Sequence, residues 1–254
     1  NGSDSGHVRV YDYNGSAWVQ VGTDIDGEAA GDRSGSTVSL SSDGSRIAIG
    51  ADRNDAGGDN AGHVRIYDYN GSAWVQVGAD INGEAANDSS GYSVSLSSDG
   101  SRVAIGAGGN DGNGSNSGHV RIYDYNGSAW VQVGADIDGE AAGDYSGWSV
   151  SLSSDGSRVA IGAPYNDGNG SNSGHVRVYS ISSGGSYQYA WDVDSGGSPS
   201  DGTYRATVAG ADLAGNAYSG TDSITFTLDT SAPTVTLTDT DSDNLVSTSE
   251  VVTI

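Results

Sequence analysis

The chain has 254 residues and a formal net charge of -23, from 33 acidic and 10 basic residues. This charge repels phosphate backbones and argues against nucleic acid as a partner. The absence of Cys excludes disulfides and thiolate metal sites. No apolar run approaches the roughly 20 residues that span a bilayer, so we expect no membrane-spanning segment. Because residue 1 is Asn1, we expect a piece of a longer protein.

A near-identical repeat of 56 residues organises the first part of the chain, residues 1–180. Its most regular element is Gly-His-Val-Arg, whose His recurs as His7, His63, His119 and His175. There are three complete units, 7–62, 63–118 and 119–174, and a partial fourth unit from 175. Repetition at such a period indicates supersecondary units that stack on their neighbours.

Each unit predicts four short strands. In the first unit, Val8 and Val10 alternate with polar residues, as in a half-buried strand. Asn14-Gly15 predicts a two-residue hairpin with positive φ, and Asp43-Gly44 predicts a second hairpin. Four strands per repeat are typical of a propeller blade. The predicted fold class is therefore all-β, a partial β-propeller of four-stranded, 56-residue blades.

Equivalent positions of the units should be equally buried. We predict one burial class for Val8, Val64 and Val120, and one for Leu40, Leu96 and Leu152. Three complete blades are fewer than the four to eight or so that close a propeller. We therefore expect further blades before Asn1.

The repeat ends near Ser180, and the rest of the chain predicts a different β-domain. Residues 181–186 form a Ser/Gly-rich linker. Strand-like segments follow at 187–193, 203–209 and 223–228.

The third unit resembles the FG-GAP repeat of integrin-α-type propellers. It carries in order Ser146-Gly-Trp-Ser-Val150, Ile161-Gly-Ala-Pro164 and Gly174-His-Val-Arg-Val-Tyr179. Ser-Gly stands in place of Phe-Gly, and Gly-Ala-Pro is complete only in this unit. The resemblance implies an extracellular, seven-bladed propeller for adhesion or ligand binding. It also implies calcium in an Asp-rich hairpin, although the corresponding segment 42–45 carries a single acid.

The C-terminal part resembles bacterial immunoglobulin-like domains of large adhesins. The resemblance rests on the turn Asp212-Leu-Ala-Gly-Asn216 and on Ala232-Pro-Thr-Val235, which opens the next domain in that family. It implies that 187–231 is part of one β-sandwich and that 232–254 holds the first strands of another. The two pieces could also pair with each other as one small sandwich.

One acidic motif near the C-terminus has calcium-ligand spacing. Asp239, Asp241, Asp243 and Glu250 fall at positions one, three, five and twelve of an EF-hand-like loop, with Asn244 replacing the usual Gly. Its flanks are strand-like, so the candidate is a β-flanked calcium site, and the alternative is a solvated acidic turn. The triplets Asp111, Asn113, Ser115 and Asp167, Asn169, Ser171 are further candidates or simply flexible turns.

Two repeated side chains have alternative interpretations. The four His residues should be spread around a propeller axis, which argues against a shared metal and favours a place beside a strand start. The repeated Trp18, Trp74 and Trp130 are either anchors between blades, which we favour, or surface aromatics that stack on sugars.

The sequence contains no nucleophile elbow and no His-Glu-x-x-His, so we expect no enzyme. The predicted function is an extracellular or cell-surface adhesion module that binds a cell-surface or matrix protein or glycan. The alternative is an accessory or substrate-binding region of a secreted carbohydrate-active enzyme.

Overall fold

The computed structural model describes residues 2–181, 202–207, 223–228 and 236–238. All regular elements of these residues are β-strands, which confirms the all-β prediction. The chain divides into two compact units, Asn1–Ser183 and Gly184–Ile254. Within the described residues, no helix is long and apolar enough to cross a membrane.

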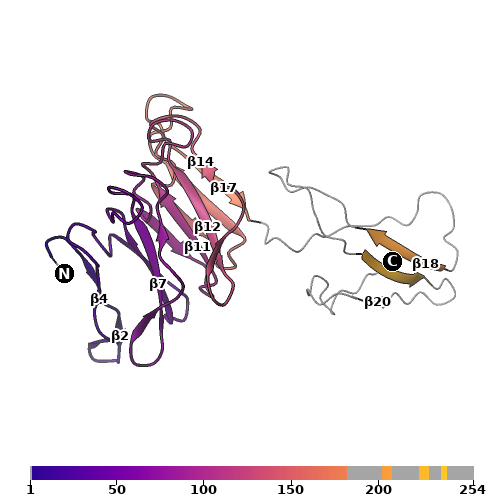
Figure 1. Cartoon of the computed structure of the whole chain (residues 1–254), viewed down its shortest axis with the longest axis horizontal. Coiled ribbons are helices and arrows are strands. Elements are labelled where there is room, and N and C mark those ends of the chain that lie inside the picture. Colours follow the sequence, from indigo (N-terminus) through magenta and orange to yellow (C-terminus); the bar gives the residue numbers. More distant parts are fainter. Residues whose placement is uncertain (1, 182–201, 208–222, 229–235, 239–254) are drawn as a thin grey trace. The chain divides into compact units, whose positions relative to one another are not determined.

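The first unit is a series of antiparallel sheets that follow one another in sequence order (Figure 1). The sheet order β5-β6-β7-β8 is formed by β5 (Thr37–Leu40), β6 (Arg46–Ala51), β7 (His63–Tyr69) and β8 (Trp74–Gln76), and β9 (Ile81–Asn82) also pairs with β7. The next sheet repeats this order with β10 (Ser93–Leu96), β11 (Arg102–Ala107), β12 (His119–Tyr125), β13 (Trp130–Gln132) and β14 (Ile137–Asp138).

Incomplete sheets stand before and after these two. The first residues form two strand pairs, β1 (His7–Val8) with β4 (Ile25–Asp26) and β2 (Tyr11–Tyr13) with β3 (Trp18–Gln20). The third large sheet consists of β15 (Ser149–Leu152), β16 (Arg158–Ala163) and β17 (His175–Ser180).

Each sheet is offset by half a unit from the sequence repeat. Strands β5 and β6 come from unit 7–62, whereas β7 and β8 come from unit 63–118. Consecutive units are therefore joined by strand pairing as well as by packing. With four antiparallel strands in order, each complete sheet resembles a propeller blade.

Consecutive sheets meet along their first strands, β5, β10 and β15. The backbone N–H of Leu96 donates to the Ser39 hydroxyl at 2.9 Å, and that of Leu152 donates to the Ser95 hydroxyl at 2.9 Å. Gly106 in β11 permits this approach, because a Cβ at that position would collide with the carbonyl oxygen of Gly147. This contact sets the spacing between neighbouring sheets.

Apolar side chains between the sheets form the core. Val8, Val64 and Val120 are all buried, which confirms their predicted equivalence. The prediction for the Leu residues is wrong: Leu96 is buried, Leu152 is partly buried and Leu40 is 47% exposed. Leu96 and Leu152 each pack against the sheet before their own. Among the described residues, no strand equivalent to β5 precedes Leu40, so its side chain has no such surface to cover it.

The predicted two-residue turn at Asn14-Gly15 is also wrong. Because Tyr13 pairs with Trp18, four residues form the loop. The Asn14 side-chain oxygen accepts hydrogen bonds from the backbone N–H groups of Ser16 and Ala17, both at 3.0 Å. Only Gly15 of the predicted pair has positive φ, at 96°. The amide side chain of Asn14 thus organises a longer turn than the dipeptide alone indicates.

The described strands of the second unit form one antiparallel sheet, with the order β18 (Gly202–Thr207), β19 (Ser223–Leu228) and β20 (Thr236–Thr238). Strand β20 lies in the segment 232–254, yet it pairs with β19 of 187–231. An immunoglobulin-like sandwich is not seen in these three strands. The predicted strand at 187–193 lies outside the described residues.

Candidate binding site

The positions at which all three complete repeats carry different residues lie close together in the structure. At only four of the 56 repeat positions do all three units carry different residues. These positions are Arg33/Ser89/Tyr145, Ser36/Tyr92/Trp148, Asp52/Gly108/Pro164 and Arg53/Gly109/Tyr165. All four lie just before the first strand of a sheet or just after its antiparallel partner. Thr37 pairs with Gly50, so both segments meet at the same end of each sheet.

Four aromatic residues at these positions contact one another, and we call them the aromatic patch. The rings of Tyr92 and Trp148, which belong to consecutive sheets, have centroids 4.7 Å apart. Tyr145 and Tyr165 are 5.4 Å apart at 71°. Trp148 lies 5.9 Å from Tyr165 and 6.0 Å from Tyr145. The patch therefore spans two sheets: the Tyr92–Trp148 contact between them is tilted at 51°, and the contacts among the other rings are edge-to-face.

The aromatic patch is accessible on a fixed backbone. Tyr92, Trp148 and Tyr165 are 38%, 39% and 42% exposed. Tyr145 has φ of 53°, and its counterparts Arg33 and Ser89 have φ of 58° and 55°. The turn thus keeps one conformation while its side chain changes from unit to unit. Clustered, exposed aromatic rings offer flat apolar faces to a sugar ring or to an apolar side chain.

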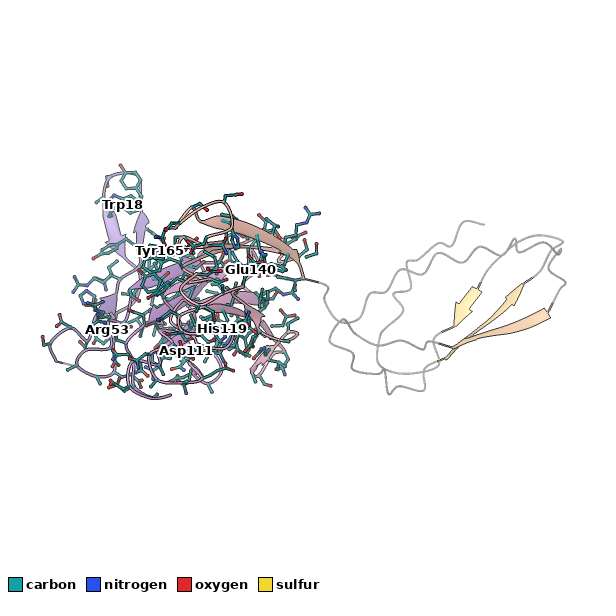
Figure 2. All side chains as sticks on the ribbon, turned by 90° about the horizontal axis from the view of Figure 1, so that it is seen from above. Trp18, Arg53, Asp111, His119, Glu140 and Tyr165 are labelled. Atoms are coloured by element: carbon teal, nitrogen blue, oxygen red, sulfur yellow. The ribbon has the colours of Figure 1, made fainter. Side chains whose placement is uncertain are left out.

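The first 56-residue repeat, 7–62, carries cations at two positions where the third repeat, 119–174, carries aromatic rings. Arg33 and Arg53 are exposed and make no ion pair with any described residue. Figure 2 labels Arg53 and Tyr165, the equivalent residues of the first and third units. The same end of the array therefore presents a different surface in each unit.

Of the three repeated Trp residues, Trp74 and Trp130 are packing anchors, as favoured, whereas Trp18 is not. Trp74 Nε1 donates to the carbonyl oxygen of Val21 at 2.9 Å, which ties β8 to the preceding sheet. Trp130 makes the equivalent bond to Val77. Trp18 is 70% exposed and lies on a hairpin that projects from the first unit (Figure 2).

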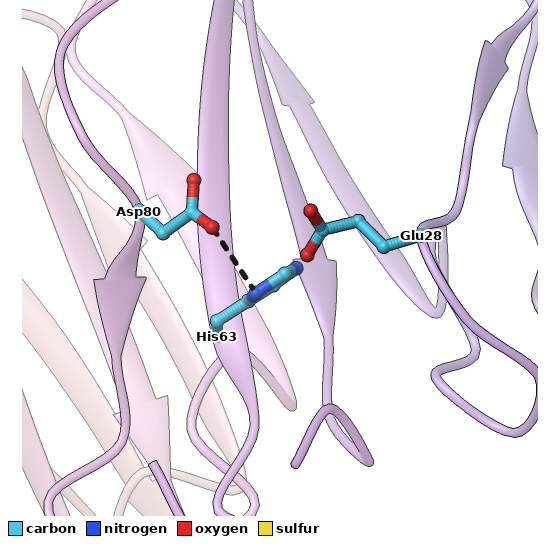
Figure 3. A group of neighbouring side chains, drawn as sticks. All are labelled: Glu28, His63 and Asp80. Atoms are coloured by element: carbon cyan, nitrogen blue, oxygen red, sulfur yellow. Dashed lines mark ion pairs between the residues drawn. The ribbon is translucent and has the colours of Figure 1, made fainter. Parts of the chain in front are cut away.

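A second group of side chains combines one His with two carboxylates. The side chain of His63, at the start of β7, lies between those of Asp80 and Glu28 (Figure 3). His63 is 3% exposed, and its Nδ1 lies 3.9 Å from Asp80 Oδ2. Arg65 donates to Asp80 through Nε at 3.0 Å and Nη2 at 2.8 Å, and it also pairs with Glu28.

The same group recurs one unit later, with a different arrangement of the Arg. His119 Nδ1 lies 3.6 Å from Asp136 and 4.0 Å from Glu84. Arg121 donates to the carbonyl oxygen of Asn82 at 2.8 Å instead of to Asp136, and it pairs with Glu84 at 3.5 Å. Each group gathers its three ligand atoms within 4.8 Å of one another.

In a third copy, Glu140, His175 and Arg177 line a small pocket, and no carboxylate equivalent to Asp80 is described there. Each of these copies thus contains one His, in keeping with the expected spread of the His residues.

Burial keeps the two central imidazoles neutral. The pKa of His63 is lowered by desolvation first and by the charge of Arg65 second, against opposing effects of Asp80 and Glu28. The pKa of His119 is lowered by the same two causes, with Arg121 as the cation. A neutral imidazole is the form that binds metal ions.

The predicted calcium residues, Asp239, Asp241, Asp243 and Glu250, lie outside the described residues. In the long loops, Asp111 and Asp167 accept hydrogen bonds from the backbone N–H groups of Asn116 and Asn172, at 2.7 Å and 2.6 Å. These carboxylates therefore act as turn acceptors.

The Asp43 hairpin has its own internal hydrogen bonds. The Ser41 hydroxyl and then the Ser45 backbone N–H lower the pKa of Asp43 to about 2. These contacts give the single carboxylate of this hairpin a structural role.

Comparisons with known proteins agree with part of the sequence prediction. The FG-GAP repeat model matches residues 82–123 and 136–179, so the chain carries two FG-GAP repeats. The chain is similar to the tricorn protease over 93% of its own length and 25% of that chain, with 11% identity and a TM-score of 0.41.

A second similar structure is a 6-phosphogluconolactonase candidate from Bacteroides uniformis, with 88% of this chain and 78% of that chain covered, 11% identity and a TM-score of 0.30. The chain spans about a quarter of the tricorn protease chain. No curated protein sequence matches the chain.

Proposed function

We propose that the compact unit Asn1–Ser183 is a ligand-binding module of an extracellular or cell-surface adhesion protein. Its ligand contacts the aromatic patch. The observation that carries this proposal is the distribution of sequence differences. The scaffold of strands, turns and anchors is nearly invariant across the three units, whereas the four fully divergent positions gather at one end of the sheets. Complete divergence gathered at one end of otherwise similar units favours a role for that end in contacting a ligand.

The chemistry of the aromatic patch favours a glycan as the ligand. Sugars present apolar C–H faces that stack on Trp and Tyr rings, and Tyr hydroxyls add hydrogen bonds to sugar hydroxyls. The net charge of -23 disfavours strongly anionic polymers as ligands. A protein ligand that inserts an apolar side chain would use the same rings. Binding to a glycan array or to immobilised matrix proteins distinguishes the two kinds of ligand.

The test measures binding to a glycan array and to immobilised matrix proteins. Trp148→Ser and Tyr165→Ser should reduce binding at least tenfold. Trp18→Ser is the control, because Trp18 is also an exposed aromatic residue, at 70% against 39% for Trp148, but it lies outside the aromatic patch. No binding to either panel, or equal loss in all three variants, would contradict the proposal.

A carbohydrate-active enzyme remains the second candidate, because the same patch would hold a polysaccharide for a catalytic domain elsewhere in a longer protein. We propose that this chain itself has no catalytic activity, since its fully divergent positions supply rings, cations and one acid, Asp52, rather than a paired acid and base. Hydrolysis assays on each polysaccharide that binds would test this. The complete reading frame would show whether a catalytic domain accompanies the module.

Calcium at Asp239, Asp241, Asp243 and Glu250 also stays a proposal, supported by ligand spacing alone. A divalent cation would offset the repulsion among three close carboxylates and stiffen the C-terminal part of the chain. Calcium should then raise the melting temperature relative to chelator, and Asp241→Ala should abolish the difference. Equal melting in both media would leave a solvated acidic turn.

A further inference from the structure

We propose that the two Glu–His–Asp groups of the compact unit Asn1–Ser183 are sites for a divalent transition-metal ion, with zinc as the best fit. The first site consists of Glu28, His63 and Asp80, and the second of Glu84, His119 and Asp136. Because the two sets are one repeat apart, the array would carry the same site twice. Each ion would bind one imidazole nitrogen and two carboxylate oxygens, leaving a position for water.

The geometry is close to that of a bound ion. The three potential ligand atoms of each group lie within 4.8 Å of one another. Zn–N and Zn–O distances of about 2.0–2.2 Å place neighbouring ligand atoms of a tetrahedral ion roughly 3.5 Å apart. Both Glu side chains are more than 40% exposed, and each must exchange its ion pair with Arg65 or Arg121 for the metal ion. Small side-chain movements therefore complete each site without backbone change.

A buried nitrogen without a partner points into the first site. His63 Nδ1 is inaccessible to solvent and makes no hydrogen bond, although it faces Asp80 at 3.9 Å. In His119, which is 1% exposed, the buried nitrogen without a hydrogen bond is Nε2, and Nδ1 faces Asp136 and Glu84 at 3.6 Å and 4.0 Å. Buried polar atoms are almost always paired, so an unpaired nitrogen beside two carboxylates requires an explanation. A metal ion supplies the missing partner.

The neighbouring Arg makes the two sites unequal. Arg65 bonds Asp80 twice and pairs with Glu28, so an ion must displace it from both carboxylates. Arg121 donates to the carbonyl oxygen of Asn82 and pairs with Glu84 at 3.5 Å, but it makes no hydrogen bond to Asp136, which accepts one from Gln132. We therefore expect tighter binding at the second site.

The donor set selects the metal. Imidazole nitrogen suits zinc, copper and nickel, whereas calcium takes six to eight oxygen ligands. Sites of this type would also join the sheets: Glu28 follows β4 of the first strand pair, while His63 begins β7 and Asp80 precedes β9 of the next sheet. Because such a site exists only in the folded array, zinc should raise the melting temperature.

The experiment combines calorimetry with NMR spectroscopy on the protein after a chelator has removed any bound metal. Zinc should bind with a stoichiometry of two, and calcium should not compete. The four His residues allow each imidazole to be followed in a long-range 1H–15N spectrum. Zinc should shift the nitrogens of His63 and His119 and leave those of His7 and His175 unchanged.

Glu28→Gln and Glu84→Gln should each weaken one of the two zinc-binding events at least tenfold. Both variants keep the fold, because these side chains are partly exposed. The matched control is Glu140→Gln, which alters the same position of the third copy, where no Asp is described, and should leave both events unchanged.

Three results would overturn the proposal. One is the absence of saturable zinc binding to the wild type. The second is unchanged binding in the Glu28→Gln/Glu84→Gln double variant, which would place zinc at other acidic groups. The third is a shift of all four imidazoles alike. The proposal is independent of the aromatic patch, so loss of zinc binding and loss of ligand binding are separate outcomes.

Discussion

The indole nitrogen of Trp130 donates a hydrogen bond to the carbonyl oxygen of Val77, 2.9 Å away and 53 positions earlier in the chain. Trp130 belongs to β13, and Val77 follows β8 of the preceding sheet. Trp74 makes the same bond to Val21 one unit earlier. The last strand of each complete sheet is thus fixed to its predecessor, far from the first strands β5, β10 and β15, where the sheets also meet.

Trp130→Phe should destabilise the array by about 1–3 kcal/mol, because it removes a partly buried hydrogen bond and part of the packing between sheets. Trp18→Phe should change stability by less than about 0.5 kcal/mol. Both Trp rings contact a Tyr of their own hairpin, so the comparison isolates the bond between sheets. Urea denaturation measures the difference, and equal destabilisation would show that the indole N–H does not join the sheets.

Arg102 connects sheets through charge. It donates to both carboxylate oxygens of Asp124, at 2.5 Å and 2.6 Å, and to the carbonyl oxygen of Gly156 in the next sheet at 2.7 Å. Arg102→Met should cost about 1–3 kcal/mol, since Asp124 loses its partner and the Gly156 carbonyl loses a buried donor.

The matched control for this change is Arg158→Met. Arg158 is exposed and pairs across its sheet with Ser180, where the repeat has no Asp. It should change stability by less than about 0.5 kcal/mol. A similar effect of both substitutions in thermal denaturation would assign the role of Arg102 to its aliphatic stem instead of its guanidinium.

Gly106 should be intolerant of any side chain. A Cβ there would collide with the Gly147 carbonyl oxygen of the next sheet, and Gly106 has no positive φ to complicate the comparison. Gly106→Ala should destabilise by about 1–3 kcal/mol through overpacking. Gly108→Ala, where the nearest atom is 3.8 Å away, should be close to neutral. If calorimetric melting shows no difference between the two, the sheets separate more easily than the structure indicates.

Repeat and strand periodicity sufficed to predict the all-β class and the equal burial of Val8, Val64 and Val120, because the side-chain alternation of a strand is a local property. Leu40 was mispredicted because its burial depends on a neighbouring sheet. Asn14 was mispredicted because its side chain replaces a backbone turn bond. Local pattern alone decides neither feature.

The candidate sites depend on contacts between sheets, and the order of residues along the chain does not show which sheets are in contact. Glu28 and His63 are 35 positions apart and meet only because a loop of one sheet lies against the first residue of a strand in the next. The sequence holds a signal for the aromatic patch that the sequence analysis did not use: its rings lie at positions where all three units carry different residues. Tyr92 and Trp148 were therefore detectable without coordinates.

The stability of the first unit should fall as the pH falls below about 6.5, the ordinary His value. The pKa values of His63 and His119 are lowered in the folded state, mainly by burial. The unfolded chain therefore takes up protons first. Stability is fully present above about pH 6.5 and is lost as the pH falls toward the lowered folded values.

Urea denaturation between pH 7.5 and 5, with chelator present, measures this dependence. The Asp80 and Glu28 carboxylates oppose the shift at His63, so the slope reports the net effect of burial against these charges. The double variant His63→Gln/His119→Gln should lower overall stability but flatten the pH dependence. The control His7→Gln/His175→Gln should keep the wild-type slope. A wild-type slope in the first double variant would mean that other groups bind the protons, and the two buried imidazoles would then have no part in the acid sensitivity of the array.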